Sequence, residues 1–286
     1  MQVAPRVQPT AGGIPPLATP PDLGQNKGAL PPAAPPPPDP SMATFVAVAL
    51  ALYVIAFLVT AVAPRAGRFA LLVAVLVHLV ATVQRGWLLG FFPLTNKMES
   101  FSTASLGVAL VALAHWRRER LYCLPLVALA GVYLWVATTF SLALTPPPPL
   151  MRTIWYPLHV PLAFVAYGLW AAAAAAAAAW LRTRDPAWLR HVDLLALQGF
   201  GLWSLSMICG GVWGVLAWGA YFLWDPKVIW SVILWFHFAT YVHVKLTPSL
   251  QGRPWVRPAL ALVGFAFVLV AYVGTSFFWG RSSHAF

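Results

Sequence analysis

The sequence predicts an all-α, polytopic membrane protein with about eight transmembrane helices and a tryptophan-rich loop on its outer side. Hydrophobic residues make up 60% of the chain, charged residues 9%, and the mean hydropathy is +0.74, which together exclude an ordinary soluble domain. Apolar stretches of about 20 residues, long enough to cross a bilayer, recur along the chain. The net charge of +11 does not indicate nucleic-acid binding, because basic residues of a membrane protein mostly set its orientation.

The chain begins with a tail, residues 1–41, that differs from the rest. It has no aromatic residue and four consecutive prolines at 35–38, so it cannot bury enough apolar surface to fold, and we expect a disordered or polyproline segment. It contains no charged segment followed by an apolar stretch, and we therefore do not expect a signal peptide. Met42 directly precedes the first apolar stretch and is an alternative start of translation.

Residues 42–286 are predicted to form one membrane domain of eight spans. The third span is the shortest, and the fifth contains an uninterrupted run of alanines at 171–179, which favours a helix and carries no chemistry. Cys123 and Cys209 lie in separate spans without a C-x-x-C pair, so we expect buried thiols and no thiol–disulfide activity. The predicted spans are 43–63, 69–91, 100–116, 121–144, 155–181, 194–217, 228–247 and 258–280.

Lysine and arginine residues predict the orientation of these spans. The connections after the first, third, fifth and seventh spans carry eleven of them, whereas the opposite face, with both termini, carries six. Because cytoplasmic connections are enriched in basic residues, we expect both termini and the connection after the sixth span to lie outside. The eleven are Arg65, Arg68, Arg117, Arg118, Arg120, Arg182, Arg184, Arg190, Lys245, Arg253 and Arg257, and the six are Arg6, Lys27, Lys97, Arg152, Lys227 and Arg281.

The segment 210–230 is the densest aromatic part of the chain. It contains six aromatic residues, one carboxylate and one ammonium group. Such side chains can form a surface that lies flat against a large planar ligand and contacts its charged edge. Two plainer interpretations remain open: an aromatic belt at the membrane surface, and charges at a helix start. The residues are Trp213, Trp218, Tyr221, Phe222, Trp224, Asp225, Lys227 and Trp230.

Histidines supply candidate metal ligands. His159 begins the fifth span and His284 lies near the C-terminus, both on the predicted outer face with the aromatic segment. Neutral imidazoles can supply both axial ligands of a heme iron, so this arrangement suits a bis-histidine heme site; a hydrogen-bonded surface role is the alternative for each. His78 and His243 lie within predicted spans, where ionisable groups are costly and often functional. His237 is a weaker candidate.

The segment 213–245 resembles the CcsA (ResC) family of cytochrome c biogenesis proteins, with its tryptophan-rich "WWD" signature. Three further blocks match the same family: one after the second span with an N-x-x-E-S sequence, the surroundings of His159, and Ser283-His284. The matching residues are Trp213, Trp218, Gly219, Tyr221, Trp224, Asp225, Pro226, Lys227, Trp230 and 241–245, and upstream His78, Arg85, Trp87 and 93–100.

The resemblance implies an integral plasma (inner) membrane protein that binds heme b and presents it at the outer face to apocytochrome c. It implies His159 and His284 as axial ligands, the aromatic segment as a cradle, and His243 as a ligand within the membrane, paired with His78 or with a histidine of a partner. That partner would be a CcsB/ResB-like membrane subunit, and the complex a cytochrome c synthase (heme lyase). No catalytic residue is assigned to this chain, whose role is positioning and delivery of the cofactor.

The sequence departs from the family pattern at three places. Phe222 replaces a usual Trp, Val228 replaces a usual Glu, and the Tyr-Gly that usually follows the C-terminal histidine is missing after His284. Two other functions stay open: a secondary transporter with proton-relaying His and Glu groups, and a regulatory membrane protein of tetrapyrrole synthesis. The absence of an internal repeat argues against the first, and the intact Trp-Asp-Pro-Lys run argues against the second. Whether heme is actively transported, its reductant and the cytochrome clients are left open.

Overall fold

The structure, a computed structural model, describes residues 40–278. The predicted tail, apart from its last two residues, and His284 with Arg281 lie outside the described residues. Within 40–278 the chain forms helices and connecting loops without a β-strand, which confirms the all-α prediction. Seven helices are long and apolar enough to cross a membrane, which confirms a polytopic membrane protein.

Eight long helices account for the described bundle. They are α1 (Pro40–Val62), α2 (Pro64–Leu89), α3 (Lys97–Ala114), α4 (Arg120–Thr138), α5 (Trp155–Thr183), α6 (Pro186–Trp218), α7 (Pro226–Leu246) and α9 (Val256–Leu269), the last continued by a π-helical turn η2 (Val270–Gly274) and α10 (Thr275–Phe277). The short η1 (Pro149–Met151) and α8 (Pro248–Gln251) lie in connections. The third predicted span corresponds to α3, which is not among the seven apolar spans because its first turns are polar.

Helix starts and ends follow the local sequence. Pro64, Pro186 and Pro226 occupy the first position of their helices, where a missing N–H costs nothing. Gly90 and Gly219 end α2 and α6 with φ of +60° and +74°, a left-handed conformation that a residue with a Cβ rarely adopts. The connection after the sixth predicted span is therefore short, because α6 continues to Trp218 and only 219–225 forms a loop.

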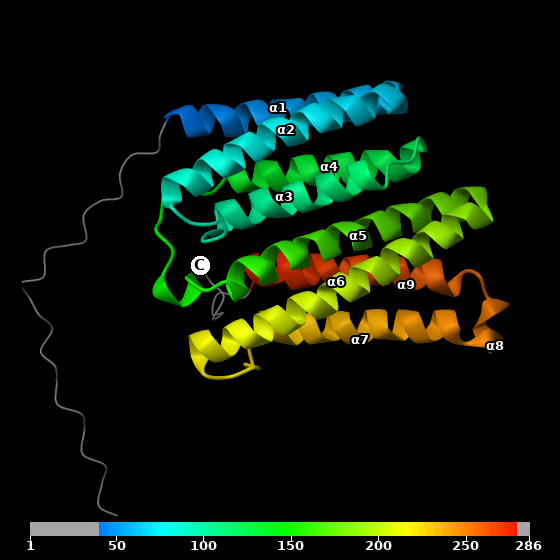
Figure 1. The fold of residues 1–286 in the computed structure, drawn as a ribbon. Helices are drawn as coiled ribbons and strands as arrows, with labels where there is room; N and C mark the ends of the chain where they lie inside the picture. Colours follow the sequence, from blue (N-terminus) through cyan, green and yellow to red (C-terminus); the bar gives the residue numbers. More distant parts are fainter. Residues whose placement is uncertain (1–39, 279–286) are drawn as a thin grey trace, which may run out of the picture. The chain divides into compact units, whose positions relative to one another are not determined.

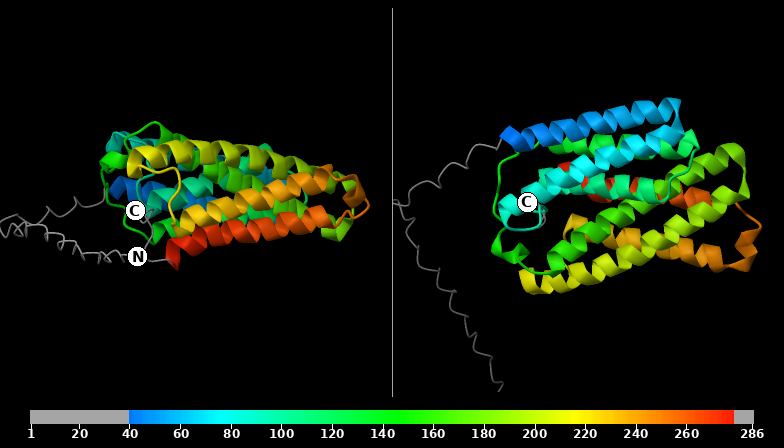
Figure 2. Two further views of the ribbon diagram at one scale, coloured as in Figure 1. Left: turned by 90° about the horizontal axis from the view of Figure 1, so that it is seen from below. Right: turned by 45° about the horizontal axis from the view of Figure 1, so that its top comes forward.

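The long helices alternate in direction, so their connections gather at two ends of the bundle (Figure 1). One end holds the start of α1, the α2–α3, α4–α5 and α6–α7 connections, and α10; the other holds the remaining connections, as the second orientation also shows (Figure 2). The eleven basic residues identified from the sequence all belong to this second end or its adjoining helix turns. The structure thus reproduces the alternation on which the predicted orientation depends.

Helix α5 is the central helix of the bundle and packs against α6, α3 and α9. Its alanine run, 171–179, is almost wholly buried, so these small residues act by allowing close helix packing. Gly107 on α3 and Gly168 on α5 mark a close approach of these two helices, since a Cβ on either would lie 3.0 Å from a backbone oxygen of the other helix. Large apolar side chains on α1 and α2 face outward, as expected for surfaces in contact with lipid.

Candidate functional site

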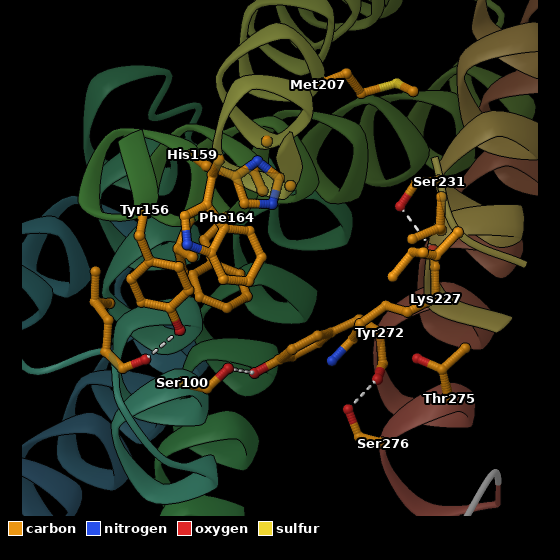
Figure 3. Close-up of a pocket in the computed structure, with 18 of the residues that line it drawn as sticks. Ser100, Tyr156, His159, Phe164, Met207, Lys227, Ser231, Tyr272, Thr275 and Ser276 are labelled. Atoms are coloured by element: carbon orange, nitrogen blue, oxygen red, sulfur yellow. Dashed lines mark hydrogen bonds between the residues drawn. The ribbon is translucent and has the colours of Figure 1, made fainter. Parts of the chain in front are cut away.

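A cavity of about 320 Å³ lies at the end of the bundle that contains the α6–α7 loop. Its walls come from α5, α6, α7, the η2–α10 segment and the start of α3, and aromatic side chains form much of them. Figure 3 shows His159 and Phe164 on one side of the cavity and Lys227 on the other, with Tyr272 between them. The volume falls within the range of about 300–1,000 Å³ found for small-molecule sites.

His159, the fifth residue of α5, lines this cavity and is held by α6. Its Nδ1 lies 2.8 Å from the carbonyl oxygen of Ser206 and 3.0 Å from the hydroxyl oxygen of the same residue. That hydroxyl donates to the carbonyl oxygen of His159 at 2.9 Å. Because a carbonyl oxygen only accepts, Nδ1 carries the proton of the neutral ring and Nε2 carries the lone pair. Metal-binding histidines are commonly oriented in this way.

Gly210 makes room for the imidazole. It follows Ser206 by one helical turn, and a Cβ at position 210 would lie 2.7 Å from both Cε1 and Nδ1 of His159. Ser206, Gly210 and Gly214 recur every four residues and so share one face of α6. Sequence reasoning missed Ser206 and Gly210, although this spacing of small residues was the available signal for a close approach by another group.

Trp213 is a fixed part of the cavity wall. It is 1% exposed, its Nε1 donates to the carbonyl oxygen of Leu150 at 2.8 Å, and its ring contacts Trp218 and Tyr156 with centroids 4.6 and 5.0 Å apart. The hydroxyl of Tyr156 in turn donates to the carbonyl oxygen of Leu94 at 2.7 Å, a bond drawn in Figure 3. These two bonds tie the α2–α3 and α4–α5 connections to the cavity wall.

The aromatic segment divides into two groups. Trp213, Trp218 and Tyr221 line the cavity together with Phe222, whereas Trp224, which is 87% exposed, is not among the described lining residues. The cavity-lining part of the loop after α6 therefore ends before Trp224.

Asp225 and Trp230 also lie outside the described cavity lining. The carboxylate of Asp225 accepts the backbone N–H of Lys227 at 2.9 Å and caps α7, as the interpretation of a charged helix start anticipates. Trp230 packs against Phe267 of α9, with ring centroids 5.9 Å apart. Lys227, the second residue of α7, does line the cavity.

The two intramembrane histidine candidates are not brought together. His78 on α2 is 1% exposed, with Nδ1 3.2 Å from the Tyr53 hydroxyl and Nε2 2.8 Å from the Ser102 hydroxyl. His243 is exposed in the last turn of α7, at the end opposite the cavity. Since α2 packs against α1 and α3, and α7 against α6 and α9, the two imidazoles lie on different sides of the bundle (Figure 1).

Comparison with known proteins decides the family. The family model described as "Cytochrome C assembly protein" matches residues 41–281. The "Cytochrome c biogenesis protein CcsA" of Synechococcus sp. (strain CC9605) is 30% identical over 285 residues, covering 82% of this chain and 91% of the relative. The chain belongs to the CcsA family of cytochrome c biogenesis proteins. The resemblance found from the sequence is thereby confirmed.

Another CcsA relative agrees with this assignment, and a solved structure shares the fold. The CcsA protein of Prochlorococcus marinus (strain AS9601) is 28% identical over 254 residues, covering 72% of this chain and 81% of the relative. The solved structure of "Cytochrome c Heme Lyase CcmF" superimposes with a TM-score of 0.63 at 20% identity, covering 85% of this chain and 47% of that one. The likeness to CcmF shows a shared fold. As a CcsA family member, the protein is a multi-pass membrane protein of cytochrome c biogenesis.

Proposed function

We propose that this protein binds heme b in the cavity beside His159 and presents it at the outer face of the plasma membrane for attachment to apocytochrome c. The observation that carries the proposal is the position of His159, which lines the aromatic cavity with its Nδ1 2.8 Å from the Ser206 carbonyl oxygen. Donation from Nδ1 to that carbonyl oxygen would place the ring lone pair on Nε2, as is common for metal-binding histidines. Membership in a cytochrome c biogenesis family supports the same cofactor.

The residues present fit a porphyrin in three respects. The wall is aromatic and apolar, Gly210 leaves room for the imidazole, and cationic side chains enter the same cavity. Bound heme supplies vinyl groups to which the thiols of a C-x-x-C-H segment of the apocytochrome add. The chain's own residues would orient and shield the cofactor. His159 would hold the iron, Ser206 would keep the proton on Nδ1, and Trp213 and Trp218 would exclude water from one wall.

The remaining ligand assignments rest on the family resemblance. His284, outside the described residues, is proposed as the second axial ligand of the outer heme. His243 is proposed as a heme ligand within the membrane. Its exposure on α7 favours an axial partner from a CcsB/ResB-like subunit over His78, because both ring nitrogens of His78 are already hydrogen-bonded. Exposed apolar side chains on the same helix, Phe236 among them, suit such a subunit contact.

The distribution of basic residues supports the proposed outer location of the cavity. Eleven lysine and arginine residues lie at the opposite end, whereas the described cavity end has Lys97, Arg152 and Lys227 in its connections and adjoining helix turns. By the positive-inside rule, this distribution supports an outer location for the cavity end.

The test is the heme content and visible spectrum of the full chain purified with its partner subunit. We expect His159→Gly to lower outer-site heme occupancy about tenfold or more, and added imidazole to restore the Soret band, because a free imidazole can replace a lost ligand but not a lost structural contact. The control, His115→Ala at the opposite end, should retain the wild-type spectrum. Unchanged heme content and axial spectrum in His159→Gly would refute the site.

A further inference from the structure

The charged side chains of the described cavity lining all have the same sign. Among the described residues that line it, the charged ones are both lysines: Lys97, the first residue of α3, and Lys227, the second residue of α7. These two helices are far apart in the sequence, and both begin at the end of the bundle that contains the cavity. Both ammonium groups therefore belong to the wall of one cavity.

Glu99 and Asp225 are the carboxylates nearest in sequence to the two lysines. Asp225 caps α7 by accepting the backbone N–H of Lys227 at 2.9 Å, and it does not form an ion pair with the Lys227 ammonium. Glu99 lies two residues after Lys97, but its oxygens accept from Arg85 Nε at 2.7 Å and from the backbone N–H of Thr95 at 2.6 Å. The Lys97 ammonium donates to the carbonyl oxygen of Ser276 at 3.2 Å. Within residues 40–278 the ion pairs are Arg85–Glu99 and Arg257–Asp193, so neither cavity lysine has a carboxylate partner within 4.0 Å.

Two like charges in an apolar cavity of a membrane protein are costly to desolvate. Such groups persist where an opposite charge compensates them, and here the described protein supplies none at salt-bridge distance. A ligand with two anionic groups would neutralise both ammonium groups at once. Lysine suits this task because its ammonium has three donors on a flexible stem, so its reach adapts to the spacing of the two anionic groups.

We propose that Lys97 and Lys227 form a clamp for the two propionate carboxylates of the tetrapyrrole, so that the cavity selects dicarboxylate porphyrins and fixes how the ring is rotated about the axis through His159. This inference rests on the proposed function and assigns the polar contacts of the same site. With both carboxylates at the lysines, the edge of the ring that bears the vinyl groups is directed away from them. The clamp therefore determines which edge of the cofactor an apocytochrome can reach.

The experiment compares hemin with hemin dimethyl ester, which has the same iron and ring but no carboxylate charge. Both are titrated into the full-length protein with its partner subunit, in nanodiscs of phosphatidylcholine, and binding is followed by the Soret band. We expect wild type to bind hemin about tenfold or more tightly than the ester, the range for charge-assisted hydrogen bonds. Lys97→Met and Lys227→Met should each weaken hemin binding about tenfold, leave ester binding unchanged, and together remove the preference.

Lys245→Met is the matched control, because it makes the same substitution on α7 at the opposite end of the helix, and it should keep the preference. Equal affinity of wild type for hemin and ester would overturn the clamp while leaving heme binding intact. The clamp also fails if either cavity substitution weakens the binding of hemin and of the ester equally. It fails as well if phosphatidylglycerol nanodiscs abolish hemin binding only when both lysines are present, because the lysines would then bind a lipid phosphate. A wild-type protein that binds neither ligand would refute the proposed function and the clamp together.

Discussion

At the scale of single residues, the position of the His159 imidazole depends on small residues of α6. The imidazole lies against Gly210, and Ser206 one turn earlier provides both an acceptor for Nδ1 and a donor for the backbone of α5. The ring is consequently held by two adjacent turns of one helix. Small changes of volume on this face of α6 should be felt directly by the proposed ligand.

Gly210→Ala is expected to displace the His159 ring. A Cβ at this position would meet the imidazole at 2.7 Å, well below van der Waals contact, and overpacking of this kind costs about 1–3 kcal/mol. We therefore expect heme affinity to fall about tenfold, measured by titration of the Soret band. Gly201→Ala, on the same helix with nothing within 4 Å of the added Cβ, is the control. Equal heme affinity of the two variants would contradict the assigned role of Gly210.

Individual site residues were predictable from the sequence only in part. His159 stands out because it is an imidazole at the start of an apolar span, but Ser206 is 47 residues away, and nothing in either segment alone predicts that they meet. His78, as a possible partner of His243, was also a ligand candidate from sequence. The structure gives it two hydroxyl partners, Tyr53 and Ser102, from neighbouring helices. Such partners depend on helix packing, which periodicity does not specify.

At the scale of elements, a buried ion pair organises the loops beside the cavity. Arg85 on α2 donates to Glu99 on α3 and to the carbonyl oxygens of Leu142 and Ala143 at 2.8 and 2.9 Å, while Glu99 also accepts from Thr95. One guanidinium and one carboxylate thus join the α2–α3 connection to the segment after α4. Because α3 begins at Lys97, the same network positions the start of that helix.

Glu99→Gln should destabilise the protein by about 3–5 kcal/mol, because removing one partner leaves the other charge buried and uncompensated. Thermal unfolding of the purified protein in detergent measures the effect. Asp193→Asn offers a matched control at the opposite end of the bundle, since the Arg257–Asp193 side chains are 19% and 13% exposed against 4% and 0% for Arg85–Glu99. Its cost should be clearly smaller, and a similar or larger cost would show that burial is not the deciding factor.

The elements themselves followed from sequence more closely than the site did. Apolar runs located the helices, since they reflect a local requirement of a helix in a bilayer. The aromatic segment was harder. It was expected to act as one surface, yet Trp213 ends inside the bundle, Trp224 is exposed and Trp230 packs on α9. A helix end, a loop and a helix start point their side chains in different directions, whatever their shared composition.

At the scale of the whole described bundle, the alternating helices place the cavity and most of the basic residues at opposite ends. One end carries the cavity, with its aromatic wall and two lysines, and the other carries a dense set of arginines. The sequence predicted which end is rich in basic residues, because the charges of the connections can be counted without knowing how the helices pack. It could not predict the cavity, which requires α3, α5, α6, α7 and the η2–α10 segment to converge at one end.

The proposed orientation predicts which connections are accessible from outside the cell. Ser141 lies exposed after α4 at the cavity end, and Ala187 lies exposed at the start of α6 at the basic end. In a background with Cys123→Ala and Cys209→Ala, a membrane-impermeant maleimide should label Ser141→Cys in intact cells and Ala187→Cys only after permeabilisation, because the arginine-rich end is retained inside. Both substitutions are small and exposed, so folding should be preserved. The reverse labelling pattern would put the cavity inside the cell, where it could not present heme to an apocytochrome on the outer face.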